Sequence, residues 1–216
     1  CEAYGCDLEP TVACAADSWR DYCTPGLDDQ PARLAGNTFT TVCGDIDNDG
    51  DFDLFHTEIH HKWAGVSGDG RQLLINDGSG VFDRADNEEN GLARKQPQMS
   101  DWNEGDLEGA FFDYDADGWK DILLVDSDYE DTHLFAWQNQ GDGTFEDVSD
   151  ATGLNQPWPH GAAVADFDRD GDLDVVTGSS HARGGSPWTE NTRHLWENGR
   201  GGSSMRISGL AVGTRV

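Results

Sequence analysis

Aspartates at a fixed spacing carry the clearest chemistry in this 216-residue sequence. In residues 113–121, acidic side chains occupy positions 1, 3, 5 and 9, and glycine occupies position 6. Carboxylates on alternate residues can converge on one hard cation, and the glycine permits the sharp turn that this convergence requires. The same pattern occurs at residues 45–53 and 166–174. The sequence therefore predicts three equivalent cation-binding loops.

The composition of these loops favours calcium. Ligand sets made only of oxygen favour Ca²⁺ over zinc or copper, and Mg²⁺ prefers to keep its waters. The loops are not EF-hands, because position 12 is His56, Leu124 or Thr177 instead of glutamate. The alternative is an acidic hairpin turn without a metal, but three copies in register argue against it. We expect about three Ca²⁺ ions.

Apolar, strand-like runs flank each loop, for example residues 110–112 and 122–125 around the second loop. Each loop is followed by two further strand-like runs, joined by a turn rich in Asn and Gly. Units of four short strands that recur every ~40–60 residues are typical of β-propeller blades. We therefore predict an all-β fold of about three four-stranded blades.

The chain divides into two regions. Residues 1–36 predict a cysteine-rich, loop-rich N-terminal cap, and residues 37–216 hold the repeats, at about 37–103, 104–159 and 160–216. Three blades do not close a propeller, which needs four to eight. Either the polypeptide continues, the N-terminal segment adds a blade, or copies complete each other through their exposed edges. We therefore expect a homo-oligomer or a larger propeller.

All five cysteines lie in the first fifth of the chain: Cys1, Cys6, Cys14, Cys23 and Cys43. Their spacing lacks the paired knuckles of a zinc site and favours disulfides in an oxidising compartment. Because the number of cysteines is odd, one thiol would have no disulfide partner within the chain. Either Cys1 is the lipidated first residue of a mature lipoprotein, or one cysteine is free or intermolecular. A start at Cys1 instead of Met indicates a processed protein or a fragment.

The composition excludes some classes of partner. The formal net charge is -28, and no basic patch is present to neutralise the phosphates of a nucleic acid. No apolar run reaches the length that spans a membrane. Eight Trp and nine Phe argue against disorder. An acidic surface of this kind suits a salty or calcium-rich medium, so we expect an extracellular or cell-surface protein.

The order of cation loop, strand and N-x-G-x-G-x-F turn resembles the FG-GAP/VCBS repeat, the blade of integrin-α-like β-propellers. Phe82 and Phe145 occupy the final aromatic position, and residues 145–148 with 153–154 match the usual link between blades. The chain is most similar to secreted proteins of the ASPIC/UnbV, or cartilage-acidic-protein-like, type. Its tail, residues 205–216, resembles the start of their ASPIC/UnbV segment. The repeat resemblance covers about residues 37–200.

The resemblance implies a specific ligand set in each loop. The carboxylate ligands would be Asp45, Asp47, Asp49 and Asp53; Asp113, Asp115, Asp117 and Asp121; and Asp166, Asp168, Asp170 and Asp174. The residue at position 7 would donate its backbone carbonyl: Asp51, Trp119 and Asp172. Trp119 supports this role for the backbone, because an indole ring cannot bind calcium.

Together these features predict a calcium-binding extracellular adhesion or structural module that is not an enzyme, with a protein or glycan partner at the cell surface. The alternatives are a lectin or a polysaccharide-active enzyme that uses His60 or His61. Stacking on sugars would use the loop residues Trp63, Trp102, Trp158 and Trp188, although contacts within or between blades are favoured for them. His56, Glu58 and His60 share one strand face and could bind a transition metal, but a polar blade surface is favoured.

Overall fold

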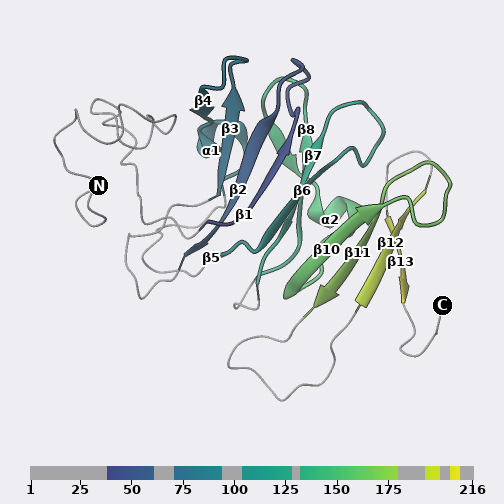
Figure 1. Cartoon of the computed structure of the whole chain (residues 1–216). Coiled ribbons are helices and arrows are strands. Elements are labelled where there is room, and N and C mark those ends of the chain that lie inside the picture. Colours follow the sequence, from purple (N-terminus) through teal and green to yellow (C-terminus); the bar gives the residue numbers. More distant parts are fainter. Residues whose placement is uncertain are drawn as a thin grey trace.

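The computed structural model describes residues 38–60, 71–93, 104–127, 132–179, 193–199 and 205–209. Within these ranges the chain forms three antiparallel sheets, which lie side by side in chain order (Figure 1). Each sheet is a meander in which consecutive strands pair. The all-β prediction is confirmed, and the sheets are consistent with three propeller blades.

The strand bounds are as follows. The first blade contains β1 (Thr38–Gly44), β2 (Asp53–His60), β3 (Gln72–Asn76) and β4 (Phe82–Arg84), and the short β5 (Glu104–Gly105) pairs with β2. The second blade contains β6 (Glu108–Phe112), β7 (Asp121–Val125), β8 (Phe135–Asn139) and β9 (Phe145–Asp147). The third blade contains β10 (Pro159–Ala165), β11 (Asp174–Ser179), β12 (Arg193–Asn198) and β13 (Met205–Gly209).

Short helices occur in the links between blades, where the sequence predicted none. They are α1 (Asn87–Asn90) and α2 (Ser149–Thr152). Each helix ends at a glycine in the left-handed region, Gly91 or Gly153, where a residue with a Cβ would be strained. The next residue, Leu92 or Leu154, is fully buried. The two links therefore anchor successive blades in the same way.

The hydrophobic core lies between the blades, and β7 shows why. Successive side chains of a strand point to opposite faces, so Ile122 and Leu124 pack in the cluster shared with the first blade. Leu123 and Val125 pack in the cluster shared with the third blade. Because both faces are covered, every residue of β7 is buried and the strand is apolar almost throughout.

A buried ion pair joins the first blade to its neighbour. The Arg71 Nε lies 2.9 Å from a carboxylate oxygen of Asp106, and its Nη1 donates to the Leu92 carbonyl at 2.8 Å. The guanidinium also lies 5.6 Å from the ring centroid of Trp137, a residue of the second blade. The positive charge is thus compensated on three sides, which a buried guanidinium requires.

Other predictions fall partly outside the described residues. Residues 1–37 are among those not described, so the predicted cap and its disulfides remain predictions. Cys43, on β1, is exposed and has a free thiol. The tail residues Met205–Gly209 form β13, the outer strand of the third blade, which the sequence pattern did not identify. In the described part of the chain, no helix is long and apolar enough to cross a membrane.

Substitution of Gly91 tests how tightly the first link packs on the second blade. A Cβ at Gly91 would lie 2.2 Å from the Phe145 carbonyl oxygen, whereas a Cβ at Gly80, whose φ is similar, would meet nothing within 4 Å. We expect Gly80→Ala to cost about 1 kcal/mol through backbone strain and Gly91→Ala to cost a further 1–3 kcal/mol. Urea unfolding of both variants measures the difference. Equal losses would contradict the close packing.

Candidate metal centres

Each predicted loop connects the first and second strands of its blade, and all three share one backbone conformation. Position 6 has a positive φ in every loop, at Gly50 (99°), Gly118 (94°) and Gly171 (101°). This confirms the sharp turn expected from the sequence. Position 4 is also left-handed, at Asn48 (60°), Ala116 (60°) and Arg169 (65°). The sequence did not predict this, because two of those residues rarely adopt this region.

Backbone amides hold the loop carboxylates in place. In the second loop, the Gly118 amide donates to Asp113 at 3.0 Å, and the Trp119 amide donates to Asp117 at 2.8 Å. The first and third loops repeat the bond at position 1, from Gly50 to Asp45 and from Gly171 to Asp166, each at 3.2 Å. These backbone bonds therefore fix the orientation of the carboxylates.

Three carboxylates converge in every loop. In each group, one carboxylate oxygen per residue lies within 4.8 Å of the others. The groups occupy positions 1, 3 and 9: Asp45, Asp47 and Asp53; Asp113, Asp115 and Asp121; Asp166, Asp168 and Asp174. This separation is compatible with one Ca²⁺ whose ligands lie 2.3–2.6 Å from the ion.

The remaining predicted ligands do not belong to these groups. The carboxylates at position 5 accept the amide at position 7 and are not among the converging groups: Asp49, Asp117 and Asp170. Their role as ligands remains a prediction. The same holds for the backbone carbonyls of Asp51, Trp119 and Asp172.

The aspartate at position 9 is buried and has a second function. Asp121 accepts the Tyr114 amide at 2.9 Å with one oxygen and the Asn139 amide at 2.8 Å with the other. Asp53 and Asp174 make the same pair of bonds, to Ile46 and Asn76 and to Phe167 and Asn198. Position 9 thus connects position 2 of the loop to the last residue of the third strand.

The donor set fits a hard divalent cation. Every converging side-chain atom is a carboxylate oxygen, the ligand type that calcium prefers. In the first loop, the Oδ1 atom of Asp45 is buried and has no hydrogen-bond partner in the structure. A buried oxygen without a partner is costly, and a bound cation would satisfy it.

Burial raises the pKa of several loop carboxylates above the usual range for aspartate. Removal from water raises the pKa of Asp121 from 3.8 to about 7, and the nearby carboxylates of Asp115 and Asp117 act in the same direction. Hydrogen bonds from the backbone amides of Tyr114 and Asn139 partly oppose this shift. Partial burial also raises the pKa of Asp47 and of Asp115.

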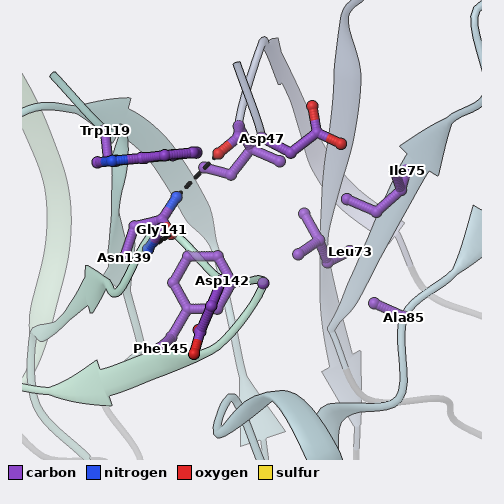
Figure 2. Close-up of a pocket in the computed structure, with 11 residues that line it drawn as sticks. Asp47, Leu73, Ile75, Ala85, Trp119, Asn139, Gly141, Asp142 and Phe145 are labelled. Carbon is purple, nitrogen blue, oxygen red and sulfur yellow. Dashed lines mark hydrogen bonds between the residues drawn. The ribbon is translucent and has the colours of Figure 1, made fainter. Parts of the chain in front are cut away.

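A groove of about 420 Å³ lies between the first and second blades, beside the first loop (Figure 2). The side chains of Leu73, Ile75, Phe145 and Trp119 form an apolar surface in this groove. The carboxylates of Asp47 and Asp142 line it as well and place polar groups beside that surface. Sequence patterns could not predict this groove, because its walls come from segments far apart in the chain.

Across this groove, the side-chain amide of Asn139 donates to the Ile46 carbonyl at 2.8 Å, the bond that is dashed in Figure 2. This hydrogen bond joins the second blade directly to the cation loop of the first, and a second one, from the Asn48 side chain to the Gly118 carbonyl at 3.1 Å, joins the two loops.

The strand face that carries His56 and Glu58 is less exposed than the polar blade surface that the sequence predicted. Glu58 is buried, and the Thr38 hydroxyl donates to it at 2.5 Å, close to where β5 pairs with β2. Burial lowers the pKa of His56. Among the described residues, neither side chain belongs to a converging ligand group. Of the other predicted residues, Trp158 is half-buried, while the side chains of His60, His61, Trp63, Trp102 and Trp188 lie outside the described residues.

Comparison with known proteins identifies the class of repeat. Residues 113–177 match the FG-GAP-like repeat family, a span that runs from the second cation loop through the third and into β11. This segment is therefore similar to an FG-GAP-like repeat, as its motifs predicted.

The particular relatives are forms of cartilage acidic protein 1. The protein from Xenopus tropicalis is 46% identical over 54 residues, and the human protein is 44% identical over 54 residues. These matches cover 24% of this chain and 8% of each relative. They confirm the resemblance to the cartilage-acidic-protein-like type.

The chain is also similar to a solved structure, that of an Agrocybe aegerita lectin described as recognising non-reducing terminal N-acetylglucosamine. It is 21% identical, with a TM-score of 0.44, and the match covers 80% of this chain and 38% of the lectin.

The stability of the cation-free protein should depend on pH through Asp121. Between pH 3.8 and about pH 7, the folded protein keeps a proton on Asp121 that the unfolded chain has released. We therefore expect this group to make the cation-free protein less stable as the pH rises through that window. Thermal melts of metal-stripped protein measure the trend, and a ¹³C titration of the Asp121 carboxyl measures its pKa. A pKa of Asp121 near 3.8 would contradict the prediction.

Proposed function

We propose that each of the three loops binds one Ca²⁺ ion and that the protein is an extracellular adhesion or structural module without catalytic activity. The observation that carries the proposal is the convergence of three carboxylates at the same positions of three equivalent loops. The ion would reduce the repulsion among these carboxylates, so calcium binding would be coupled to the stability of the blades.

Calcium would bind beside the hydrogen bonds that connect the loop to the second and third strands of its blade. The position-9 aspartates that face the ion also hold position 2 of the loop and the end of the third strand. An ion bound at the loop therefore stabilises contacts in the second and third strands of the same blade. This role requires no substrate and no turnover.

The net charge of the chain and the names of its relatives support an extracellular role. A net charge of -28 is best tolerated where divalent cations are abundant. The relatives are named for cartilage, an extracellular matrix. We propose a protein or glycan partner at the cell surface and, because a closed propeller needs four to eight blades and the described residues form three, assembly with itself or within a larger propeller.

Asp113→Asn tests the loops as calcium sites. It removes one charge at position 1 of the second loop and should lower the calcium stoichiometry from about three to two by calorimetry. At 100 times the dissociation constant, one site contributes about 2.7 kcal/mol. Its loss should lower the melting temperature in calcium by roughly 5–10 °C. Because Asp113 also accepts the backbone amides of Asp117 and Gly118, the quantity to compare is the difference in melting temperature with and without a chelator, which isolates the contribution of calcium.

Glu146→Gln is the matched control, since it removes one charge from an exposed residue of β9 outside the loops. It should leave both the stoichiometry and the calcium-dependent melting shift unchanged. If a chelator leaves the melting temperature of the wild-type protein unaltered, the calcium proposal is wrong.

The second candidate function is carbohydrate binding, and the groove of Figure 2 favours it. A sugar has apolar ring faces and a rim of hydroxyl groups. Apolar walls, the Trp119 indole and the carboxylates of Asp47 and Asp142 together offer both kinds of contact. The groove would hold a glycan without any catalytic group.

Trp119→Ala tests this second function. It removes the indole but keeps the backbone carbonyl at position 7, so calcium binding should persist. If the groove binds glycans, the variant should lose at least ~10-fold in affinity for any glycan found on an array, the effect of about 1.4 kcal/mol of lost contact. Unchanged glycan binding would place the sugar elsewhere, and no binding by the wild-type protein would remove the candidate.

A further inference from the structure

The groove between the first and second blades contains acidic groups without basic ones. Asp47 and Asp142 line it, and none of the other described residues that line it is a lysine, an arginine or a histidine. Asp47 belongs to the cation loop of the first blade, and Asp142 belongs to the turn between β8 and β9 of the second. Carboxylates therefore line the groove from both blades (Figure 2).

Each of these two carboxylates uses a single oxygen within the protein. The Oδ1 atom of Asp142 accepts the Thr144 amide at 3.0 Å and the Thr144 hydroxyl at 2.6 Å. The Oδ1 atom of Asp47 accepts the Asp49 amide at 3.2 Å. Within the described part of the chain, these are the hydrogen bonds that the two carboxylates accept. The second oxygen of each is therefore available to a donor from another molecule.

The negative charge of the groove would persist when calcium is bound. The first loop has four candidate carboxylate ligands, so one Ca²⁺ would leave a net charge of roughly -2 on them. Hydrogen bonds from the side chain and the backbone of Thr144 lower the pKa of Asp142, which keeps its carboxylate ionised at neutral pH. The formal net charge of -28 adds a long-range attraction for a basic partner.

The apolar part of the groove suits the other half of a basic side chain. Lysine and arginine combine an aliphatic stem with a charged head. Leu73, Ile75 and Phe145 offer a surface for the stem. The Trp119 indole can attract the head through its ring face. A Cβ added to Gly141 would lie 2.8 Å from this indole, so the turn of the second blade holds the ring in place.

The walls of the groove are connected before any ligand enters. The Asn139 side chain donates to the Ile46 carbonyl at 2.8 Å, and the Asn48 side chain donates to the Gly118 carbonyl at 3.1 Å. Both bonds join the first blade to the second. A preformed site saves a ligand the cost of ordering its walls. Its volume of about 420 Å³ lies within the ~300–1,000 Å³ typical of ligand sites.

We propose that this groove binds a basic side chain, lysine or arginine, of a protein partner. The stem would lie on the apolar walls, and the head would pair with the carboxylates of Asp47 and Asp142. A carboxylate that loses water requires a compensating charge or a full set of hydrogen bonds. A basic side chain supplies both, whereas an uncharged sugar supplies hydrogen bonds alone. This inference rests on the protein partner in the proposed function and identifies its chemistry.

Short blocked peptides test the proposal. Each peptide carries one arginine or one lysine, and its ends are acetylated and amidated so that the side chain bears the only charge. Binding is followed in calcium by the NMR signal of the Trp119 indole N–H. We expect both peptides to shift this signal saturably. A citrulline peptide, which keeps the shape of arginine without its charge, should bind at least about fivefold more weakly than the arginine peptide.

Asp142→Asn removes one charge from the groove and keeps an oxygen that can accept the Thr144 amide and hydroxyl. This variant should bind the arginine peptide at least about fivefold more weakly. The matched control is Asp77→Asn. Asp77 is the counterpart of Asp142 in the first blade, accepts the Ser79 amide at 2.8 Å and the Ser79 hydroxyl at 2.6 Å, and does not line the groove. This control should leave the affinity unchanged.

Three results would overturn the proposal. The first is the absence of a saturable shift with either basic peptide. The second is equal binding of the arginine and citrulline peptides. The third is an equal loss of affinity in the Asp142→Asn and Asp77→Asn variants, because the peptide would then respond to the overall charge and not to the groove. Far-ultraviolet circular dichroism of both variants confirms that a weaker affinity does not reflect a lost fold.

Two further measurements on the same samples separate this inference from the proposed function. Saturable peptide binding by a protein that binds no calcium would support the basic side chain and overturn the calcium sites. Calcium binding without peptide binding would do the reverse. A glycan that shifts the Trp119 signal where the basic peptides do not would assign the groove to a sugar and overturn the inference.

Discussion

A buried carboxylate at the start of the second strand is the interaction on which each blade depends. Burying a charge is costly unless it is fully hydrogen-bonded or paired. Asp121 satisfies this condition with two backbone amides, one from its loop and one from the end of β8. Because Asp53 and Asp174 repeat the arrangement, the loop, the second strand and the third strand are fixed together in every blade.

The hydrogen bonds of these buried aspartates are connected from blade to blade into one network. The backbone amide of Asn139 donates to Asp121, and its side-chain amide donates to the Ile46 carbonyl. The backbone amide of Ile46 in turn donates to Asp53. Asn198 makes the same connection from the third blade to the second. A cation bound at one of these carboxylates would therefore also support the neighbouring blade. The three candidate sites are connected through the backbone and side-chain hydrogen bonds of the blades.

The sequence predicted the loops and most strands, because both depend on local spacing and on alternating apolar residues. It could not predict the side-chain bond from Asn139 to Ile46 or the pairing of Arg71 with Asp106, since each joins residues far apart in the chain. Burial of Glu58 was missed for the same reason. The left-handed Ala116 and Arg169 were missed because loop closure overrides the intrinsic preference of those residues.

The central blade differs from its neighbours because both of its faces are covered, so every residue of β7 is buried. In an array of this kind, stability is close to a sum of contacts between nearest neighbours, and the end units have fewer of them. Amide hydrogens of β7 should therefore exchange with solvent only when the whole array opens, whereas those of β4 and β13 exchange through local fraying. Among the described strands, β7 would then be the last to open.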